Sequence, residues 1–425
     1  MTERVIQGVD AWEVLDSRGD PTVRVRVETP AGAGQFTVPA GASTGSFEAV
    51  ERRDGGDRYG GRGVQTVVET IRTELASVVV GRDVTDQAEI DAELVEYDGT
   101  PTLSRVGGNA VLGVSGAIAH AAARARELPL YQSVQPGDAG GIPLPMVNLI
   151  SGGAHAVGGM AVQDILVVPI GATTYPEAIE SVWAVRSALR DRLMRAGERP
   201  LVADEGGFAP SLPSTTDAFD LVTAAIRDAG YRPARDDMAL GIDVAATHFF
   251  DGDHYRLEPD RRLAQADMIE EVVEWSEAYP IVSIEDPLAE DAWDGWTALC
   301  ERVEDVQILG DDLLATNPER VQRAIEGRAA SAVLVKPNQA GTITRTLSVI
   351  ESAQAGELNV VVSARSGETS DATIADLAVA TGAGQIKIGS LARSERLAKY
   401  NRLFELYHAG VGYNDSSGSV GAGSG

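Results

Sequence analysis

The chain has 425 residues, enough for a small domain and a large barrel, and its hydrophobic content of 44% is typical of globular proteins. A formal net charge of −27 disfavours nucleic acids and anionic membranes as partners, because an acidic surface repels both. The single cysteine, Cys300, excludes an internal disulfide and a thiolate metal site. No apolar stretch approaches a membrane span, and the first residues lack a secretory segment. We therefore expect a cytoplasmic protein that acts on a small molecule.

The beginning of the chain predicts a small α+β domain over residues 1–134. Valines spaced by two over 23–27, and the segment 35–38 after them, are typical of strands. A Gly- and Ser-rich stretch over 41–46 interrupts this pattern. It predicts a loop between the strands and the helices that follow.

Helical periodicity then covers residues 64–80 and 110–127, with Ala-rich faces that permit close packing. The Gly- and Pro-rich segment that follows predicts a domain boundary. We expect a barrel domain over 142–413 and a flexible Gly- and Ser-rich tail over 414–425.

The predicted barrel domain repeats one pattern, in which a short apolar run ends at a polar or charged residue. The later repeats are about 25 residues apart, which fits one strand, loop and helix each. Eight such units predict a closed α/β barrel, whose active site lies at the carboxyl ends of the strands. The expected strand-end groups are Asp164, Glu205, Asp243, Glu285, Asp311, Lys336, the turn 363–366 and Lys387.

Three carboxylates on this rim predict a metal site. Asp243, Glu285 and Asp311 each follow an apolar strand. Carboxylate oxygens without histidine or cysteine are the ligands that Mg²⁺ prefers. Asp286 and Asp312, directly after two of them, are expected to point elsewhere and to orient the ligands or pair with a lysine.

Lysine is rare in this chain, with three lysines against 33 arginines. Two of the three, Lys336 and Lys387, end apolar runs and should face the carboxylates across the barrel mouth. Lysine can release its proton at working pH and arginine cannot. An ammonium beside another and near Mg²⁺ has a lowered pKa, and the metal would stabilise an enolate. The set predicts proton abstraction next to a carboxylate.

A second group predicts the general acid. Glu205 lies in Asp-Glu-Gly-Gly-Phe-Ala-Pro, where the glycines let the backbone approach a ligand, and Asp164 is its expected partner. His155 lies in the Gly-rich segment 151–159, which favours a closing lid, although a lone histidine is more often structural.

Two further segments carry groups for a phosphate. Arg365 and Ser366 supply a guanidinium fork and a hydroxyl. Ser43 lies in Gly-Ala-Ser-Thr-Gly, which matches the serine nucleophile elbow. That stretch follows a proline in a small domain, whereas the elbow opens a helix after a buried central strand. A mobile loop, with the Ser43 hydroxyl reaching a second metal or a phosphate, fits better than a serine hydrolase.

Nearly the whole chain resembles the enolase family. The matching segments, in the same order and spacing, are Asp-Ser-Arg-Gly-Asp-Pro-Thr-Val from Asp16, Gly-Ala-Ser-Thr-Gly from Gly41, Asp-Glu-Gly-Gly-Phe-Ala-Pro from Asp204, Ser-Ile-Glu-Asp-Pro from Ser283, Arg-Ser-Gly-Glu-Thr from Arg365 and Ala-Arg-Ser-Glu-Arg-Leu-Ala-Lys-Tyr-Asn from Ala392. The resemblance implies a small α+β domain before a modified α/β barrel, in a homodimer or larger assembly. It also implies interconversion of 2-phosphoglycerate and phosphoenolpyruvate with Mg²⁺, one ion bound tightly and a second with the substrate.

The resemblance also implies a role for each matching residue. It makes Asp243, Glu285 and Asp311 metal ligands, Lys336 the base, Glu205 the acid with Asp164 beside it, Lys387 a contact of the substrate carboxylate, Gln163 a substrate neighbour, Arg365 and Ser366 the phosphate site, and Ser43 and His155 parts of closing loops.

The chain departs from the family pattern at two main positions. Ala364 replaces a histidine before Arg-Ser-Gly-Glu-Thr, and Asp164 replaces a glutamate. Lesser departures are His248 and Arg24, each in place of a glutamate, and the residues after 401.

Both main departures shorten side chains where the family handles the leaving hydroxyl. Water could replace the imidazole and leave a slower enolase. Alternatively, the space admits a larger substituent, as in carboxyphosphonoenolpyruvate synthases of phosphonate pathways. A third alternative is a binding protein without turnover, against which the retained ligands and lysines argue.

Overall fold

The computed structural model describes residues 2–41, 45, 47–135, 137, 140–156, 159–258 and 261–414. Ser43 therefore lies outside the described residues, as does the expected tail from residue 415 onward.

The chain begins with a three-stranded antiparallel sheet in the order β1-β2-β3, where β1 is Gly8–Leu15, β2 is Pro21–Thr29 and β3 is Gly32–Thr37. The alternating valines of β2 are fully buried and face α4 (Gly108–Ala125), which packs across β2 and β3. The approach is so close that a Cβ at Gly116 would overlap the ring of Phe36. The expected strands and the expected Ala-rich helix are confirmed.

Shorter helices complete this N-terminal part. They are η1 (Thr2–Arg4), η2 (Arg58–Gly61), α1 (Gln65–Thr70), the π-helical η3 (Ile71–Leu75), α2 (Ala76–Val79), α3 (Gln87–Asp98) and α5 (Leu130–Val134). Because α1, η3 and α2 follow one another directly, they form the helical region expected over 64–80.

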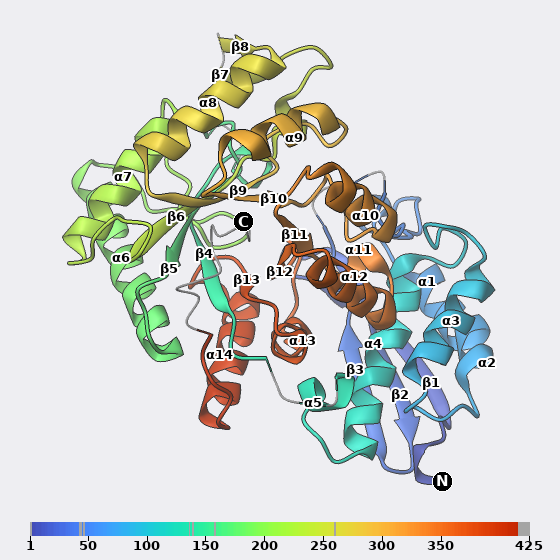
Figure 1. Cartoon of the computed structure of the whole chain (residues 1–425). Helices are drawn as coiled ribbons and strands as arrows, with labels where there is room; N and C mark the ends of the chain where they lie inside the picture. The colour runs from blue at the N-terminus through green and yellow to red at the C-terminus, as the bar shows by residue number, and fades with distance from the viewer. Residues whose placement is uncertain are drawn as a thin grey trace.

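A closed barrel follows, as expected (Figure 1). Around the barrel, the strands are β4 (Leu144–Ser151), β5 (Asp164–Pro169), β6 (Met238–Asp243), β9 (Ile281–Glu285), β10 (Gln307–Gly310), β11 (Ala332–Val335), β12 (Asn359–Ser363) and β13 (Gln385–Lys387). Nearly every strand residue is buried, because side chains fill the barrel inside and helices cover it outside.

The direction of β5 is the main departure from a uniform α/β barrel. β5 pairs antiparallel with β4 and with β6, whereas the other neighbouring strands of the barrel run parallel. Asp164 therefore begins its strand, and the prediction that it ends an apolar strand was wrong. The reversal still brings Asp164 to the active rim, because it pairs in register with Asp243, the last residue of β6.

The expected position of Glu205 was also wrong. Glu205 lies in a turn between two outer helices instead of after a barrel strand, while β4, at the expected domain boundary, supplies the missing strand. The turn is nevertheless fixed to the barrel, because Phe208 exchanges backbone hydrogen bonds with Leu149 and Ser151 of β4. Glu205 therefore lies at the same rim, although a turn bonded to β4 and not the end of a strand positions it.

Helices and a small hairpin surround the barrel. They are η4 (Gly153–His155), α6 (Tyr175–Arg195), α7 (Thr215–Asp228), η5 (Ala246–Phe249), β7 (Tyr255–Glu258), β8 (Arg261–Leu263), α8 (Gln265–Ala278), α9 (Trp293–Arg302), α10 (Pro318–Gly327), α11 (Pro337–Ala340), α12 (Ile343–Ala355), α13 (Thr373–Thr381) and α14 (Ser394–His408). Among the described residues, no helix combines the length and the apolar character that crossing a membrane requires.

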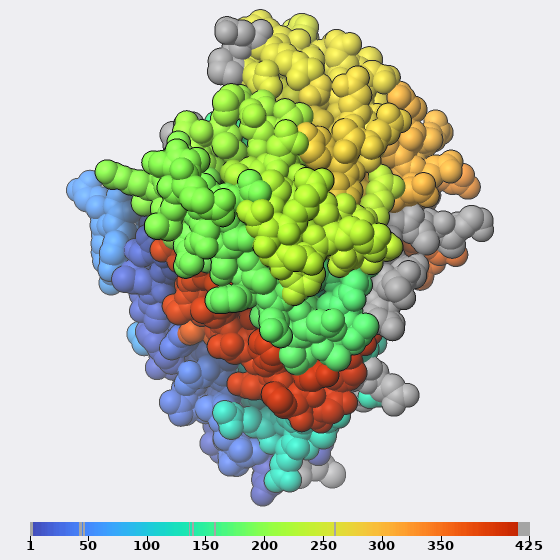
Figure 2. Space-filling model, turned by 90° about the vertical axis from the view of Figure 1, so that its left-hand side faces the viewer, coloured from blue at the N-terminus to red at the C-terminus, as the bar shows by residue number. Residues whose placement is uncertain are grey.

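The N-terminal part packs against one side of the barrel domain, where α4 contacts α11 and α12, and α5 contacts α13. Figure 2 shows the other side of the molecule, where green, yellow and red segments of the barrel domain lie nearest the viewer. Ala40 and Gly367 exchange two backbone hydrogen bonds of 2.8 and 2.9 Å across this junction. The segment after β3 is thereby held at the rim of the barrel.

Candidate active site

A polar cavity opens at the rim where the strands end. Within the described part of the chain, its lining residues are Glu48, Ala154, His155, Gln163, Glu205, Asp243, Ala245, His248, Asp286, Asp311, Asp312, Lys336, Ser363, Ala364, Arg365, Ser366 and Lys387. Most of the residues singled out in the sequence therefore meet in one place.

Lys387, at the end of β13, holds two of the three expected metal ligands. Its Nζ lies 2.7 Å from Asp243 Oδ2 and 2.6 Å from Glu285 Oε2. Burial opposes the charged form of Lys387, but the two carboxylates outweigh burial and raise its pKa well above the usual value. Gln163 Nε2 donates to the same oxygen of Asp243 at 3.0 Å. The last residues of β6, β9 and β13 and the residue before β5 thus converge.

Lys336, directly after β11, forms an ion pair with Asp311. Burial lowers the pKa of Lys336, but Asp311 attracts its proton more strongly than Arg365 and Lys387 repel it, so the pKa is raised. We expected a lowered pKa for Lys336 beside another ammonium and Mg²⁺, whereas the protein groups alone raise it. Asp286 orients the backbone that carries Asp311, because its oxygens accept the backbone N–H groups of Asp311 and Asp312 at 3.0 and 2.7 Å. Asp286 and Asp312 nevertheless line the cavity, so the expectation that they point elsewhere was wrong.

Two residues that the sequence did not single out connect this cluster to the phosphate candidates. Glu48 Oε2 accepts a 2.8 Å hydrogen bond from Arg365 Nη1. Gln339 Nε2 donates to Glu48 Oε1 at 3.3 Å and to Asp311 Oδ1 at 3.1 Å. Two features of the sequence could have identified these residues. Glu48 lies two residues after the Gly- and Ser-rich stretch, and Gln339 lies three residues after Lys336.

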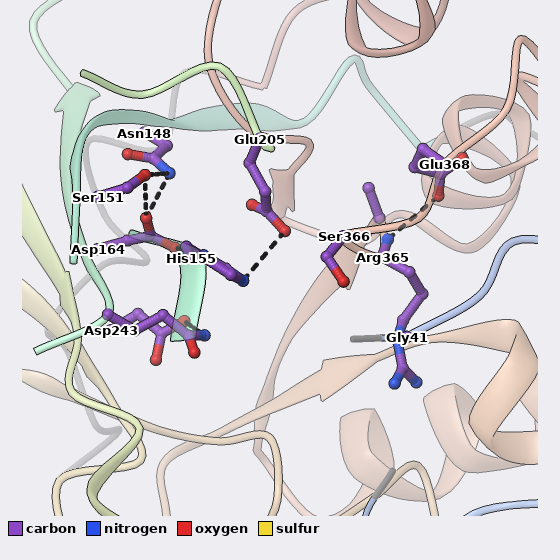
Figure 3. Close-up of polar contacts among 12 residues, drawn as sticks. Gly41, Asn148, Ser151, His155, Asp164, Glu205, Asp243, Arg365, Ser366 and Glu368 are labelled. Carbon is purple, nitrogen blue, oxygen red and sulfur yellow. Dashed lines mark hydrogen bonds and ion pairs between the residues drawn. The ribbon is translucent and has the colours of Figure 1, made fainter. Parts of the chain in front are cut away.

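The general-acid candidate Glu205 lies beside His155 in the same cavity (Figure 3). His155 stands between Asp164 and Glu205, with Nδ1 2.9 Å from Asp164 Oδ2 and Nε2 3.8 Å from Glu205 Oε1. The other oxygen of Asp164 accepts hydrogen bonds from Asn148 Nδ2 at 2.5 Å and Ser151 Oγ at 2.8 Å. Sequence analysis missed Asn148 and Ser151 because it did not identify β4.

On this side of the cavity, the surroundings favour a charged His155 beside a charged Glu205. Burial opposes protonation of His155, but Asp164 and Glu205 outweigh it and raise its pKa to about 9. Burial also raises the pKa of Glu205, but His155 and more distant cations outweigh it, and the pKa is lowered. For Asp164, burial prevails over the attraction of His155 and the pKa is raised. An imidazolium between two carboxyl groups can share a proton with either.

The turn after β12 presents Arg365 and Ser366 to the cavity. Arg365 donates its backbone N–H to Glu368 Oε1 at 3.1 Å, as Figure 3 shows. Arg18, from the N-terminal part, donates from Nη1 to Ser366 Oγ at 3.5 Å and from Nη2 to Gly41 O at 2.9 Å. A guanidinium and a hydroxyl on a fixed turn suit a phosphate.

Acidic groups that could hold a metal are present in the described residues. Asp243 and Glu285 occupy neighbouring strands in register, and Asp311 follows the next strand of the barrel. Glu285 Oε1 is buried without a hydrogen-bond partner among the described residues, as expected of an oxygen with room for a cation. Carboxylate oxygens of Asp286, Asp311 and Asp312 also lie within 4.8 Å of one another. These donors fit a hard divalent cation.

Comparisons with known proteins agree with this geometry. The family model described as the N-terminal domain of enolase matches residues 6–134, and the model described as the C-terminal TIM barrel domain of enolase matches residues 140–412. The enolase of Acidothermus cellulolyticus is 49% identical over 408 residues, which cover 95% of this chain and 94% of that protein. The chain belongs to the enolase family. The resemblance and the fold expected from the sequence are both confirmed.

In this member of the enolase family, the two main departures come from different strands, because Asp164 begins β5 beside His155, whereas Ala364 follows β12 between the strands that carry Lys336 and Lys387. Ala364, where the family motif carries histidine, is buried and lines the cavity together with His155 and Glu205. Asp164, in place of the longer glutamate, is held by β4, and among the described residues His155 bridges it to Glu205. The lysine side keeps every expected residue. Ser43 lies outside the described residues.

Proposed function

We propose that this enolase-family chain is a lyase that interconverts 2-phosphoglycerate and phosphoenolpyruvate. The observation that carries the proposal is that Lys336, Glu205 and Arg365 line one cavity, which offers a base, an acid and a phosphate ligand to one small molecule. The reaction breaks the C2–H bond next to the carboxylate and then the C3–O bond.

In the first step, Lys336 removes the C2 proton. Lys336 must be neutral for this, and its ion pair with Asp311 opposes that state. Asp311 would hold a divalent cation in this proposal, and Lys336, without its ion-pair partner, would then be free to act as a base. The electron pair of the broken C–H bond moves towards the substrate carboxylate, which Lys387 contacts in this proposal.

In the second step, the electron pair forms the C2–C3 double bond and hydroxide leaves C3. Because the lowered pKa of Glu205 favours its ionised form, Glu205 first takes a proton from the His155 imidazolium and then donates it, so that the departing group is water. His155 restores the proton through its contacts with Glu205 and Asp164, while Gln163 borders the substrate. The buried Glu205 is suited to this transfer because water does not compete with it.

The phosphate of the substrate would bind Arg365 and Ser366. Their turn is joined to the N-terminal part by Arg18 and Glu48, which orient the hydroxyl and the guanidinium. The closing segments that we propose contain Ser43 and His155. A planar guanidinium that is already oriented loses little conformational entropy on binding a phosphate.

We further propose Asp243, Glu285 and Asp311 as the ligands of Mg²⁺, one ion bound tightly and a second with the substrate. The partnerless Glu285 Oε1 supports this assignment. When bound, Mg²⁺ would neutralise negative charge that develops on the substrate carboxylate. Addition of Mg²⁺ should raise the thermal unfolding temperature, and Glu285→Gln should abolish the increase. An equal increase in both proteins would contradict these ligands.

The test of the proposed reaction is the ultraviolet absorbance of the enol product when the protein meets 2-phosphoglycerate and Mg²⁺. Turnover should fall by about 10³-fold or more in Lys336→Ala, because general base catalysis is worth about 10²- to 10⁴-fold. Absence of turnover in the native protein, together with Lys336-dependent exchange of the C2 proton into deuterated water, would instead support a different substrate.

The space beside Ala364 favours a second candidate function. An imidazole is replaced by a methyl group on the leaving-group side, so a substrate with a larger substituent fits the same base and metal ligands. This would be the enolase-like chemistry of phosphonate metabolism. Ala364→His should then abolish turnover of the bulky substrate, whereas in an ordinary enolase it should not impair turnover of 2-phosphoglycerate.

We also propose a homodimer or larger assembly in the cytoplasm. Trp183 on α6 is 62% exposed, Leu201 is 63% exposed and Leu397 on α14 is 36% exposed. These elements adjoin, because α6 contacts α14, and Arg393 before α14 donates to Val202 O at 3.4 Å. A monomeric mass in light scattering would contradict the assembly. The single half-buried cysteine accords with a reducing compartment.

A further inference from the structure

The third lysine of this lysine-poor chain is buried but does not line the cavity. Lys399 lies on the inner face of α14 and is 1% exposed. Its Nζ donates to Glu368 Oε2 at 2.6 Å and to the backbone oxygen of Thr369 at 2.7 Å. A buried ammonium must be compensated by such partners, so its position is fixed.

Glu368 connects Lys399 to the turn that carries the phosphate candidates Arg365 and Ser366. It is 3% exposed, and its two carboxylate oxygens divide their contacts. Oε1 accepts the backbone N–H of Arg365 at 3.1 Å, while Oε2 accepts Lys399 and the backbone N–H of Thr369 at 3.0 Å. The ammonium therefore stabilises the carboxylate that ties both ends of the turn together.

Another residue of α14 completes the arrangement. Arg396, three residues before Lys399 and on the same helix face, is fully buried. It donates from Nη1 to the backbone oxygen of Arg365 at 2.6 Å and from Nη2 to that of Ser366 at 2.7 Å. Helix α14 thus holds the backbone carbonyl groups of the turn directly, through Arg396. It holds the backbone N–H group of Arg365 indirectly, through Lys399 and Glu368.

The compact shape of lysine explains why arginine is absent here. Nζ lies between two acceptors that are both within 2.7 Å, and a planar guanidinium would need more room in a site without solvent. We propose that Lys399 is a positioning residue that, through Glu368, sets the backbone of Arg365 and Ser366 and thereby the affinity for the substrate phosphate. This inference rests on the proposed function, because it assumes that the turn binds a phosphate ester.

The test compares Lys399→Met with a matched control on the same helix. Arg402 lies one turn further along α14 and forms an ion pair with Asp376 at 2.8 Å, away from the turn. Lys399→Met should raise KM for 2-phosphoglycerate by about 10- to 100-fold, with a smaller loss of kcat, because small displacements of substrate ligands have effects of this size. Arg402→Met should leave KM within about twofold of the native value. Equal KM values in the two variants would overturn the inference.

A double variant separates positioning from folding. Lys399→Met leaves Glu368 buried and unpaired, which destabilises the protein. Lys399→Met combined with Glu368→Gln removes both charges, so the unfolding temperature should recover while KM stays high. Recovery of KM together with stability would show a purely structural role and contradict the proposal.

A binding measurement distinguishes failure of this inference from failure of the proposed function. Calorimetry with phosphoenolpyruvate and Mg²⁺ should show weaker binding to the double variant than to Arg402→Met, whether or not the native protein turns over 2-phosphoglycerate. Native turnover with equal affinities in both variants overturns only the role of Lys399. Absence of native turnover, with binding lost in the double variant, overturns the proposed reaction and supports the positioning role.

Discussion

The lysine side and the acid side of the cavity are built differently. On the lysine side, Lys336 and Lys387 contact carboxylates that end or directly follow consecutive barrel strands. On the acid side, the groups come from a turn, a loop and the first residue of the antiparallel strand β5. Of the two main departures from the family pattern, Asp164 belongs to the acid side, whereas Ala364 follows β12 between the strands that carry the lysines. Strand ends constrain the first set, whereas the second depends on segments that can change without altering the barrel.

The strongest test of this division removes the base. Lys336→Ala should reduce turnover of 2-phosphoglycerate by about 10³-fold or more and abolish exchange of the C2 proton, because no other described cation lies as close to Asp311. Deuterium exchange followed by nuclear magnetic resonance measures the second effect. Arg302→Met, which removes an exposed cation, is the control. Persistent exchange would mean that Lys336 is not the base.

Removing the acid should separate the two sides. Glu205→Gln should lower turnover by about 10²- to 10³-fold but leave C2 proton exchange measurable, because the lysine side is untouched. Glu270→Gln changes an exposed carboxylate on α8 and serves as the control. Parallel loss of exchange and turnover in Glu205→Gln would show that the sides do not act separately.

Restoring the family residues should have a smaller effect. Ala364→His with Asp164→Glu should change kcat by about tenfold or less, because His155 already links the two carboxyl groups. Steady-state kinetics of the single and double variants would measure this. A rise of several orders of magnitude from a negligible native rate would identify the acid side as altered for another substrate.

The smallest expected effect is on stability at high pH. The pKa of His155 is raised from 6.5 to about 9 in the folded chain. Its contribution is therefore complete below pH 6.5 and disappears as the pH rises through 9. Between these values the native protein should lose more stability with rising pH than His155→Gln, because only the native chain carries the imidazole whose pKa is raised on folding. Denaturant unfolding at several pH values provides the comparison, and identical slopes would contradict it.

The lysine side could be predicted because each of its groups ends an apolar run, and parallel strands bring such ends together. The acid side could only partly be predicted. The run after Asp164 is equally apolar in either direction, so the sequence could not reveal that β5 is reversed. Glu205 was identified by its glycines, although its turn belongs to no strand. Glu48 and Lys399 were missed because neither ends an apolar strand run, since Glu48 lies outside the barrel strands and Lys399 lies within helix α14.

The hydrogen-bonded junction between Ala40 and Gly367, together with the pairing of Glu48 and Arg365, has a consequence for how this protein can be divided. The N-terminal part supplies one wall of the cavity, so the barrel is not a self-contained catalyst. A gene fragment that encodes the barrel alone would inherit the lysines and the carboxylates but not the partner that orients Arg365. Both parts must therefore be inherited together to give a complete cavity, although the buried residues form separate hydrophobic clusters.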